Sequence, residues 1–150
     1  FQTELLETEI EVTGPVVVNL WASSSAVDTD FTAKLVDVYP PNEDFPRGFD
    51  MNITDGMIRV RYRNSFEAPE WMTPGEVYRF AIALYPTSNL FAKGHRIRVD
   101  ISSSNFPRLD VNPNTGEALG LNRRTAVAEN SVFHDAAHPS HIVLPVVSKA

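Results

Sequence analysis

The sequence predicts an all-β domain, a two-sheet antiparallel jelly-roll sandwich of about eight or nine strands. In residues 78–85 and again in residues 96–101, large apolar side chains alternate with polar or small ones at a period of two. No stretch shows the period of a helix, and no segment is repeated. The connections are long and irregular, which favours Greek-key crossings over simple hairpins. An immunoglobulin-like sandwich is the alternative.

Three strands are expected in the first 39 residues. Residues 1–13 place glutamates between leucine, isoleucine and valine, and a Gly-Pro pair cuts this segment short, so a strand fits better than a helix. Residues 16–21 are nearly all apolar and β-branched, which is typical of a strand buried on both faces. After a loop of small residues, residues 31–39 form the next strand, and a Pro-Pro pair ends it.

The middle of the chain alternates between charged connections and short strands. Residues 41–50 are rich in proline and charge, which indicates a surface connection, and residues 52–56 are expected to form a turn. In residues 58–63 isoleucine, valine and tyrosine alternate with three arginines, which predicts a half-buried strand. Residues 66–75 read as a loop that carries Trp71.

The remaining chain adds the strands at residues 78–85 and 96–101, joined by a turn-rich link over residues 86–95. Residues 102–116 have no periodicity and predict a long irregular loop. Residues 125–133 alternate weakly and are expected to form a strand. The last strand, residues 142–147, contains a proline, which suits an edge position.

Composition limits the possible functions. A chain of 150 residues is the size of one domain, and a charge of -6 argues against general affinity for nucleic acid or anionic lipid. The absence of cysteine excludes disulfides, thiol nucleophiles and thiolate metal sites. No run is long enough for a membrane span, and the first ten residues lack a signal-peptide pattern. A cytoplasmic and a secreted bacterial location both stay open, as does a removed upstream signal.

No catalytic residue is expected within this chain. A serine hydrolase needs its nucleophile in a G-x-S-x-G elbow between strand and helix, and no such motif occurs. Ser23–Ser25 and Ser102–Ser104 follow strands and lack the flanking glycines, so we interpret them as loop and turn serines.

No metal or cofactor is expected either. His134, His138 and His141 have a spacing that could hold zinc from a loop, but we interpret them as surface histidines. Residues 110–116 resemble a calcium loop, yet threonine stands where that pattern needs glycine and Leu121 where it needs glutamate. Asp28 and Asp30 could also chelate a hard cation, but we interpret the pair as a polar turn.

The arginines of residues 59–63, and Arg96 with Arg98, are each expected to share one face of a strand. We interpret them as side chains that lie over the sheet and pair with carboxylates in solvent; docking on an acidic neighbouring domain is the alternative. Among the aromatic residues, only Trp71 has a loop position suited to a ligand or a domain contact.

Several motifs resemble one family in their order along the chain. The most specific are Gly94-His95-Arg96-Ile97-Arg98, Ser102-Ser103-Ser104-Asn105-Phe106-Pro107-Arg108 and Asn112-Pro113-Asn114-Thr115-Gly116. Further matches are Gly14-Pro15-Val16-Val17, Trp21-Ala22-Ser23-Ser24, Asp28-Thr29-Asp30-Phe31, Lys34-Leu35-Val36-Asp37-Val38, Gly56-Met57-Ile58-Arg59-Val60-Arg61-Tyr62-Arg63 and Pro139-Ser140-His141-Ile142-Val143-Leu144-Pro145. Together, over residues 9–147, they resemble the C-terminal β-domain of the X-Pro dipeptidyl-peptidase and cocaine-esterase family, which includes α-amino-acid ester hydrolases.

The resemblance implies a galactose-binding-domain-like jelly roll that carries no catalytic residue. In this family an α/β-hydrolase domain with a Ser-Asp-His triad and a helical cap comes first, and the β-domain packs against both. The β-domain helps to wall the substrate cleft and, in some members, the oligomer. The positions of the triad are not in this chain, which departs from the family at His138 and His141.

The resemblance therefore predicts an accessory domain, residues 1–150, at the C-terminal end of a larger serine hydrolase. Its expected partner is the catalytic domain of the same chain, and neither nucleic acid nor a membrane is expected. A homo-oligomer stays open. Residues predicted to contact the catalytic domain are Asp28, Asp30, Phe31, Ser103, Asn105, Phe106 and Arg108. A carbohydrate-binding module and a self-sufficient enzyme are the alternatives.

Overall fold

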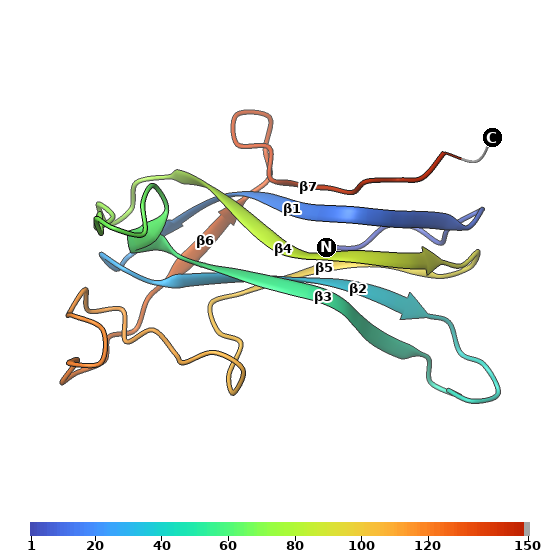
Figure 1. Ribbon diagram of the computed structural model, residues 1–150, viewed down its shortest axis with the longest axis horizontal. Helices are drawn as coiled ribbons and strands as arrows, with labels where there is room; N and C mark the ends of the chain where they lie inside the picture. Colours follow the sequence, from blue (N-terminus) through green and yellow to red (C-terminus); the bar gives the residue numbers. More distant parts are fainter. Residues whose placement is uncertain (149–150) are drawn as a thin grey trace.

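The computed structural model describes residues 1–148 and consists of seven strands and one short 3-10 helix (Figure 1). In chain order these are β1 (Ile10–Ser24), β2 (Asp30–Tyr39), β3 (Phe49–Arg59), η1 (Val60–Tyr62), β4 (Tyr78–Phe91), β5 (Arg96–Ser102), β6 (Asn130–Phe133) and β7 (His141–Val143). β4, β1 and β6 form one sheet, in which β7 also pairs with β1, and β3, β2 and β5 form the other. All pairs are antiparallel, which confirms the predicted two-sheet sandwich.

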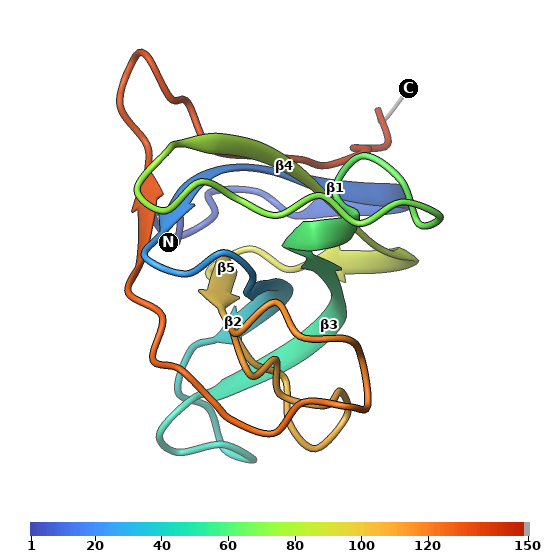
Figure 2. The same cartoon turned by 90° about the vertical axis from the view of Figure 1, so that its left-hand side faces the viewer.

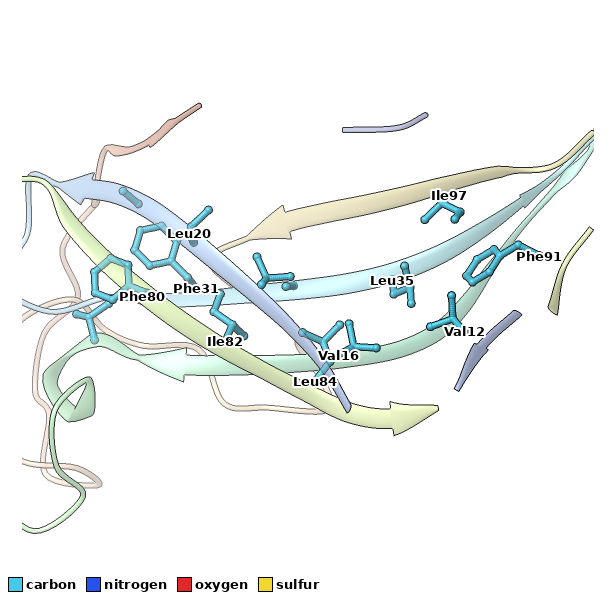
Figure 3. Close-up of a cluster of buried hydrophobic side chains, with 14 of the residues drawn as sticks. Val12, Val16, Leu20, Phe31, Leu35, Phe80, Ile82, Leu84, Phe91 and Ile97 are labelled. Atoms are coloured by element: carbon cyan, nitrogen blue, oxygen red, sulfur yellow. The ribbon is translucent and has the colours of Figure 1, made fainter. Parts of the chain in front are cut away.

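The core lies between the two sheets and follows the alternation seen in the sequence (Figure 3). Phe80, Ile82 and Leu84 of β4 point inward and are almost fully buried. They meet residues of the other sheet such as Phe31, whose ring centroid lies 5.3 Å from that of Phe80. Burying such a side chain contributes about 1.5–3 kcal/mol, so this layer supplies much of the driving force for folding.

Strand boundaries differ from the prediction where prolines were expected to end strands. β1 runs through Pro15 and β4 runs through Pro86, so fewer and longer strands form than the eight or nine expected. The register of the β1–β4 ladder shifts between Gly14 and Val16, which leaves both prolines outside the paired positions. A proline has no N–H to donate to a ladder. At a bulge the residue is unpaired and needs no donor, so both strands continue past their prolines.

A second correction concerns residues 52–63. The expected turn at residues 52–56 is part of β3, and the expected strand over residues 58–63 ends at Arg59. Beyond that point the chain tightens into η1, where Val60 N donates to the carbonyl of Thr29 at 3.0 Å. The three arginines do alternate with apolar residues, but only Arg59 lies in a strand, because the chain turns at η1. The interpretation of residues 59–63 as one strand face was therefore wrong.

The two strands expected near the end of the chain are shorter than predicted. Of residues 125–133, only those in β6 pair, and of residues 142–147 only the first two lie in β7. Val146 forms an isolated bridge with Val12 beyond Pro145. The irregular stretch after residue 102 is confirmed, since the connection from β5 to β6 has no strand or helix over residues 103–129.

Residues 1–3 extend the second sheet by pairing with the edge of β5. Thr3 N donates to Ile97 O at 3.0 Å and Val99 N donates to Phe1 O at 2.8 Å. The Phe1 side chain lines a small apolar pocket of about 200 Å³ between the sheets, together with Ile101. Edge strands attract further pairing, and this short segment covers part of that edge. Within residues 1–148, no helix has the length and apolar character that crossing a membrane requires.

The edge strands β3 and β4 lie side by side and close one corner of the sandwich. The Thr54 hydroxyl donates to the Tyr85 carbonyl at 2.8 Å. A Cβ atom on Gly56 would lie only 2.3 Å from the backbone oxygen of Ala83. Glycine is therefore required here for the close approach of two backbones.

Gly56→Ala is expected to lower the free energy of unfolding by about 1–3 kcal/mol, because the two strands must separate to admit the methyl group. Urea denaturation measures the change. Gly75→Asn is the control: a Cβ atom added there would have no neighbouring atom within 4 Å, and asparagine tolerates its φ of +82°, so a change within about 0.5 kcal/mol is expected. Equal stability of Gly56→Ala and the wild type would contradict the described approach of β3 to β4.

Candidate functional site: the loop end of the sandwich

Three connections, two of them long, meet at one end of the sandwich, which we call the loop end. They are residues 25–29 between β1 and β2, residues 60–77 between β3 and β4, and residues 103–129 between β5 and β6. Figure 2 looks onto this end, where the last of these connections crosses in front of β2 and β3. Loops carry binding residues more often than strands do, so this end is the place to look for a site.

A fully buried ion pair joins the first two of these connections. Arg61 is 3% exposed, and its Nε and Nη2 atoms donate to Asp28 Oδ2 at 2.8 and 2.6 Å. The third arm, Nη1, donates to the carbonyl of Glu117 at 2.9 Å and so reaches the long connection as well. All three connections thus share one guanidinium group, which fixes their relative positions.

A second ion pair and an asparagine complete the cluster. Arg59 Nε and Nη2 donate to the two oxygens of Asp30 at 2.9 and 2.8 Å, and this hydrogen bonding, together with the charge of Asp30, raises the pKa of Arg59. The buried Asn112 amide donates to both aspartates, at 3.0 Å to Asp28 and 2.8 Å to Asp30. We call these five residues the clasp. Two carboxylates balance two guanidinium groups, so the clasp holds the loops and leaves no charge for a ligand.

The start of the long connection is fastened separately, to β3. Asp55 is buried, pairs with Arg108 at 2.6 Å and accepts a hydrogen bond from Asn105 Nδ2 at 3.1 Å. The Arg108 guanidinium also lies over the Tyr85 ring, 5.5 Å from its centroid. Between these anchors, Phe106 is 70% exposed. Residues 103–110, the contact loop, therefore present an apolar side chain on a fixed backbone.

The structure divides the predicted contact residues into two groups at the loop end. Asp28, Asp30 and Phe31 are buried, the first two in the clasp and the third in the core. The exposed ones lie on the contact loop and are Ser103, Phe106 and Arg108, with Asn105 half-buried beneath them. The first group positions the loops, and the second lies where another protein surface can reach it.

Sequence reasoning missed the roles of Arg59, Arg61 and Asn112. The signal was present as two aspartates at Asp-x-Asp spacing and two arginines at Arg-x-Arg spacing, two matched sets of opposite charge. Asn112 lies in both the calcium-like pattern and a family motif, but neither indicates that its Nδ2 donates to both aspartates while its Oδ1 accepts from Asn114 N. Arg98, by contrast, pairs with Asp50 and Asp100 near solvent as interpreted.

The three histidines have separate partners. The His134 ring meets that of Phe1, the His138 ring packs edge-on against Trp21, and His141 bonds the Pro139 carbonyl and the Asn19 amide. Within residues 1–148, no group of three or more histidine, aspartate or glutamate side chains is arranged to hold a metal ion.

The candidate serines shape turns. Ser24 Oγ accepts from Ala26 N, Ser102 Oγ from Ser104 N, and Ser104 Oγ from Phe106 N, each two residues along the chain. This local bonding is the usual use of serine at the end of a strand. Ser25, Ser103 and Ser104 lie in loops as interpreted, whereas Ser23 and Ser24 are the last residues of β1 and Ser102 is the last residue of β5.

Beside the contact loop, a groove of about 620 Å³ runs along the corner where β3 meets β4. Its lining is mainly apolar and comes from three segments: β3 with the residues after it, β4, and the end of the contact loop. Phe66, at the rim, is 91% exposed. The loop end thus has two adjoining surfaces, the exposed contact loop and the concave groove beside it.

Comparison with known proteins places this geometry in a family. Residues 1–143 match the family described as X-Pro dipeptidyl-peptidase C-terminal non-catalytic domain. The chain is 46% identical to the cocaine esterase of Rhodococcus sp. (strain MB1 Bresler) over 151 aligned residues, which cover 99% of this chain and 25% of that protein.

Two solved structures share the fold throughout. The aminopeptidase from the marine sediment archaeon Thaumarchaeota archaeon superposes with a TM-score of 0.93 at 31% identity, over 99% of this chain and 25% of that one. An α-amino acid ester hydrolase superposes with a TM-score of 0.91 at 33% identity, over 98% of this chain and 25% of that one. The chain spans about a quarter of the length of these relatives. Because the match runs through both sheets and the loop end, the chain belongs to the family of X-Pro dipeptidyl-peptidase C-terminal non-catalytic domains.

Proposed function

We propose that residues 1–150 form the accessory β-domain of a longer serine hydrolase that acts on esters or amides. The domain packs against the catalytic part of the same chain and helps to shape its substrate cleft. The observation that carries the proposal is the family match, combined with relatives about four times as long as this chain, among them an esterase, an aminopeptidase and an ester hydrolase.

The loop end is the surface that supports this role best. Large apolar side chains are exposed there on neighbouring loops, which a free domain rarely tolerates without a partner. They are Phe66, Phe106, Leu121 and Val127. The clasp and the Asp55 anchor hold these loops in place before any contact forms, and such preorganisation lowers the entropic cost of docking.

The test is the double variant Phe106→Ser and Arg108→Ala in the full-length enzyme. Loss of the exposed aromatic ring and its anchor is expected to weaken docking by about tenfold or more, as hot-spot truncations do. Limited proteolysis between the domains and hydrolysis of ester and Xaa-Pro amide substrates measure the effect. Leu90→Ser is the control, since Leu90 is an exposed apolar residue at the C-terminal end of β4, whereas the loop end lies at the start of that strand. Unchanged cleavage and activity in the double variant would refute docking through the contact loop.

A further inference from the structure

The groove at the β3–β4 corner has a floor of small side chains. Ala81 and Ala83 of β4 face outward and line its base, between Tyr85 and Arg79 on the same strand face. Alanine adds only a methyl group to the sheet surface here, and the bulkier side chains of Phe66 and Leu109 also line the groove. A trench of this shape complements a row of bulky apolar side chains.

The groove is formed before anything binds to it. Its floor is fixed by the close approach of Gly56 to Ala83. One wall is held by Arg63, which donates to the backbone oxygens of Val60 and Glu70 and lies 4.8 Å from the centroid of the Tyr78 ring. The other wall belongs to the contact loop, which Arg108 ties to Asp55. A preformed site binds without first ordering its own side chains.

Of the charged side chains that line the groove, the two arginines have carboxylate partners, but the aspartate has no cation partner in the part of the chain that the structure describes. Arg59 pairs with Asp30, and Arg63 lies 3.5 Å from Glu70, so both guanidinium groups are balanced. Asp110, also in the lining, is exposed and has neither an ion pair nor a hydrogen bond within residues 1–148. The free charge of the groove is therefore negative and lies at the contact-loop wall.

We propose that this groove receives a ridge of bulky apolar side chains from the catalytic part of the same chain, with a lysine or arginine of that ridge placed against Asp110. This inference rests on the proposed function and specifies its partner surface. The catalytic part is the chosen occupant because about three-quarters of each matched relative lies outside the region covered here. The groove also continues the contact loop, through Leu109 and Asp110, so one partner surface covers both.

The experiment fills the groove in the full-length enzyme with Ala81→Trp and, separately, Ala83→Trp. Both side chains are exposed, so the indole projects outward and the domain keeps its fold, which circular dichroism verifies. We expect interdomain proteolysis to become about tenfold faster or more, because an overfilled interface cannot close. Ala136→Trp, an identical change at an exposed position in the β6–β7 turn, is expected to match the wild type.

The proposed basic partner is tested by Asp110→Lys, which is expected to weaken docking and to reverse its dependence on salt concentration. If Phe106→Ser with Arg108→Ala loosens the domains while both tryptophan variants behave as wild type, the groove proposal is overturned and docking stands. If all of these variants behave as wild type, both proposals fail. If the tryptophan variants change only the oligomeric state in analytical ultracentrifugation, the occupant is a second copy and the inference is wrong.

Discussion

Arg61→Met is expected to lower the free energy of unfolding of this domain by about 3–5 kcal/mol, because it leaves the Asp28 carboxylate buried without its cation. Methionine keeps much of the volume of the arginine stem, so the loss reports the charge and its hydrogen bonds rather than a cavity. The carbonyl of Glu117 loses its donor in the same variant. Urea denaturation followed by tryptophan fluorescence measures the change.

Arg96→Met is the matched control for this prediction. Arg96 pairs at 3.4 Å with Glu4, which is fully exposed, and such a pair contributes at most about 1 kcal/mol. Equal losses in the two variants would show that the clasp does not stabilise the loop end. The double variant Arg61→Met with Asp28→Leu is expected to recover part of the stability, since a buried pair replaced by apolar side chains leaves no charge unpaired.

Phe31→Ala is expected to cost about 3–5 kcal/mol, because it opens a cavity at the centre of the core. Phe31 is 1% exposed and packs on Phe80 across the two sheets. Both Phe31 and Phe106 belong to the residues predicted to contact a catalytic domain, and Phe106→Ala makes the same chemical change at an exposed position. The second variant is expected to alter the stability of the isolated domain by no more than about 0.5 kcal/mol.

Comparing Phe31→Ala with Phe106→Ala distinguishes a core residue from a residue of the docking surface. Thermal unfolding of the isolated domain distinguishes them, and the activity of the longer hydrolase proposed above adds the second readout. Under the proposed function, Phe106→Ala reduces activity without lowering the stability of the domain. A large loss of domain stability in Phe106→Ala would place its side chain in the core and remove it from the docking surface.

The core could be predicted from the sequence because its signal is local. Phe80, Ile82 and Leu84 alternate with outward residues, and a strand places alternate side chains on opposite faces whatever its partner is. The same holds for Ile97 in β5. The long connection after residue 102 was equally predictable, since its prolines and asparagines lack any period.

Strand ends and strand partners could not be predicted in this way. Pro15 and Pro86 are strand breakers by local chemistry, yet they share one bulge between β1 and β4, where neither has to donate a hydrogen bond. Their compatibility depends on the register of two segments about 70 residues apart, and no single segment contains that information.

The sequence alone determined the fold class, the inward-facing core residues, the family resemblance and the absence of a nucleophile elbow, because periodicity and motifs are properties of neighbouring residues. Only the tertiary structure decided that Arg61 is buried against Asp28 while Phe106 remains exposed. Alternation assigns a side chain to one face of a strand, but burial depends on what covers that face. Arg61 is covered by the connection between β5 and β6, which is held there by hydrogen bonds of Asn112 and Glu117, more than 50 positions further along the chain.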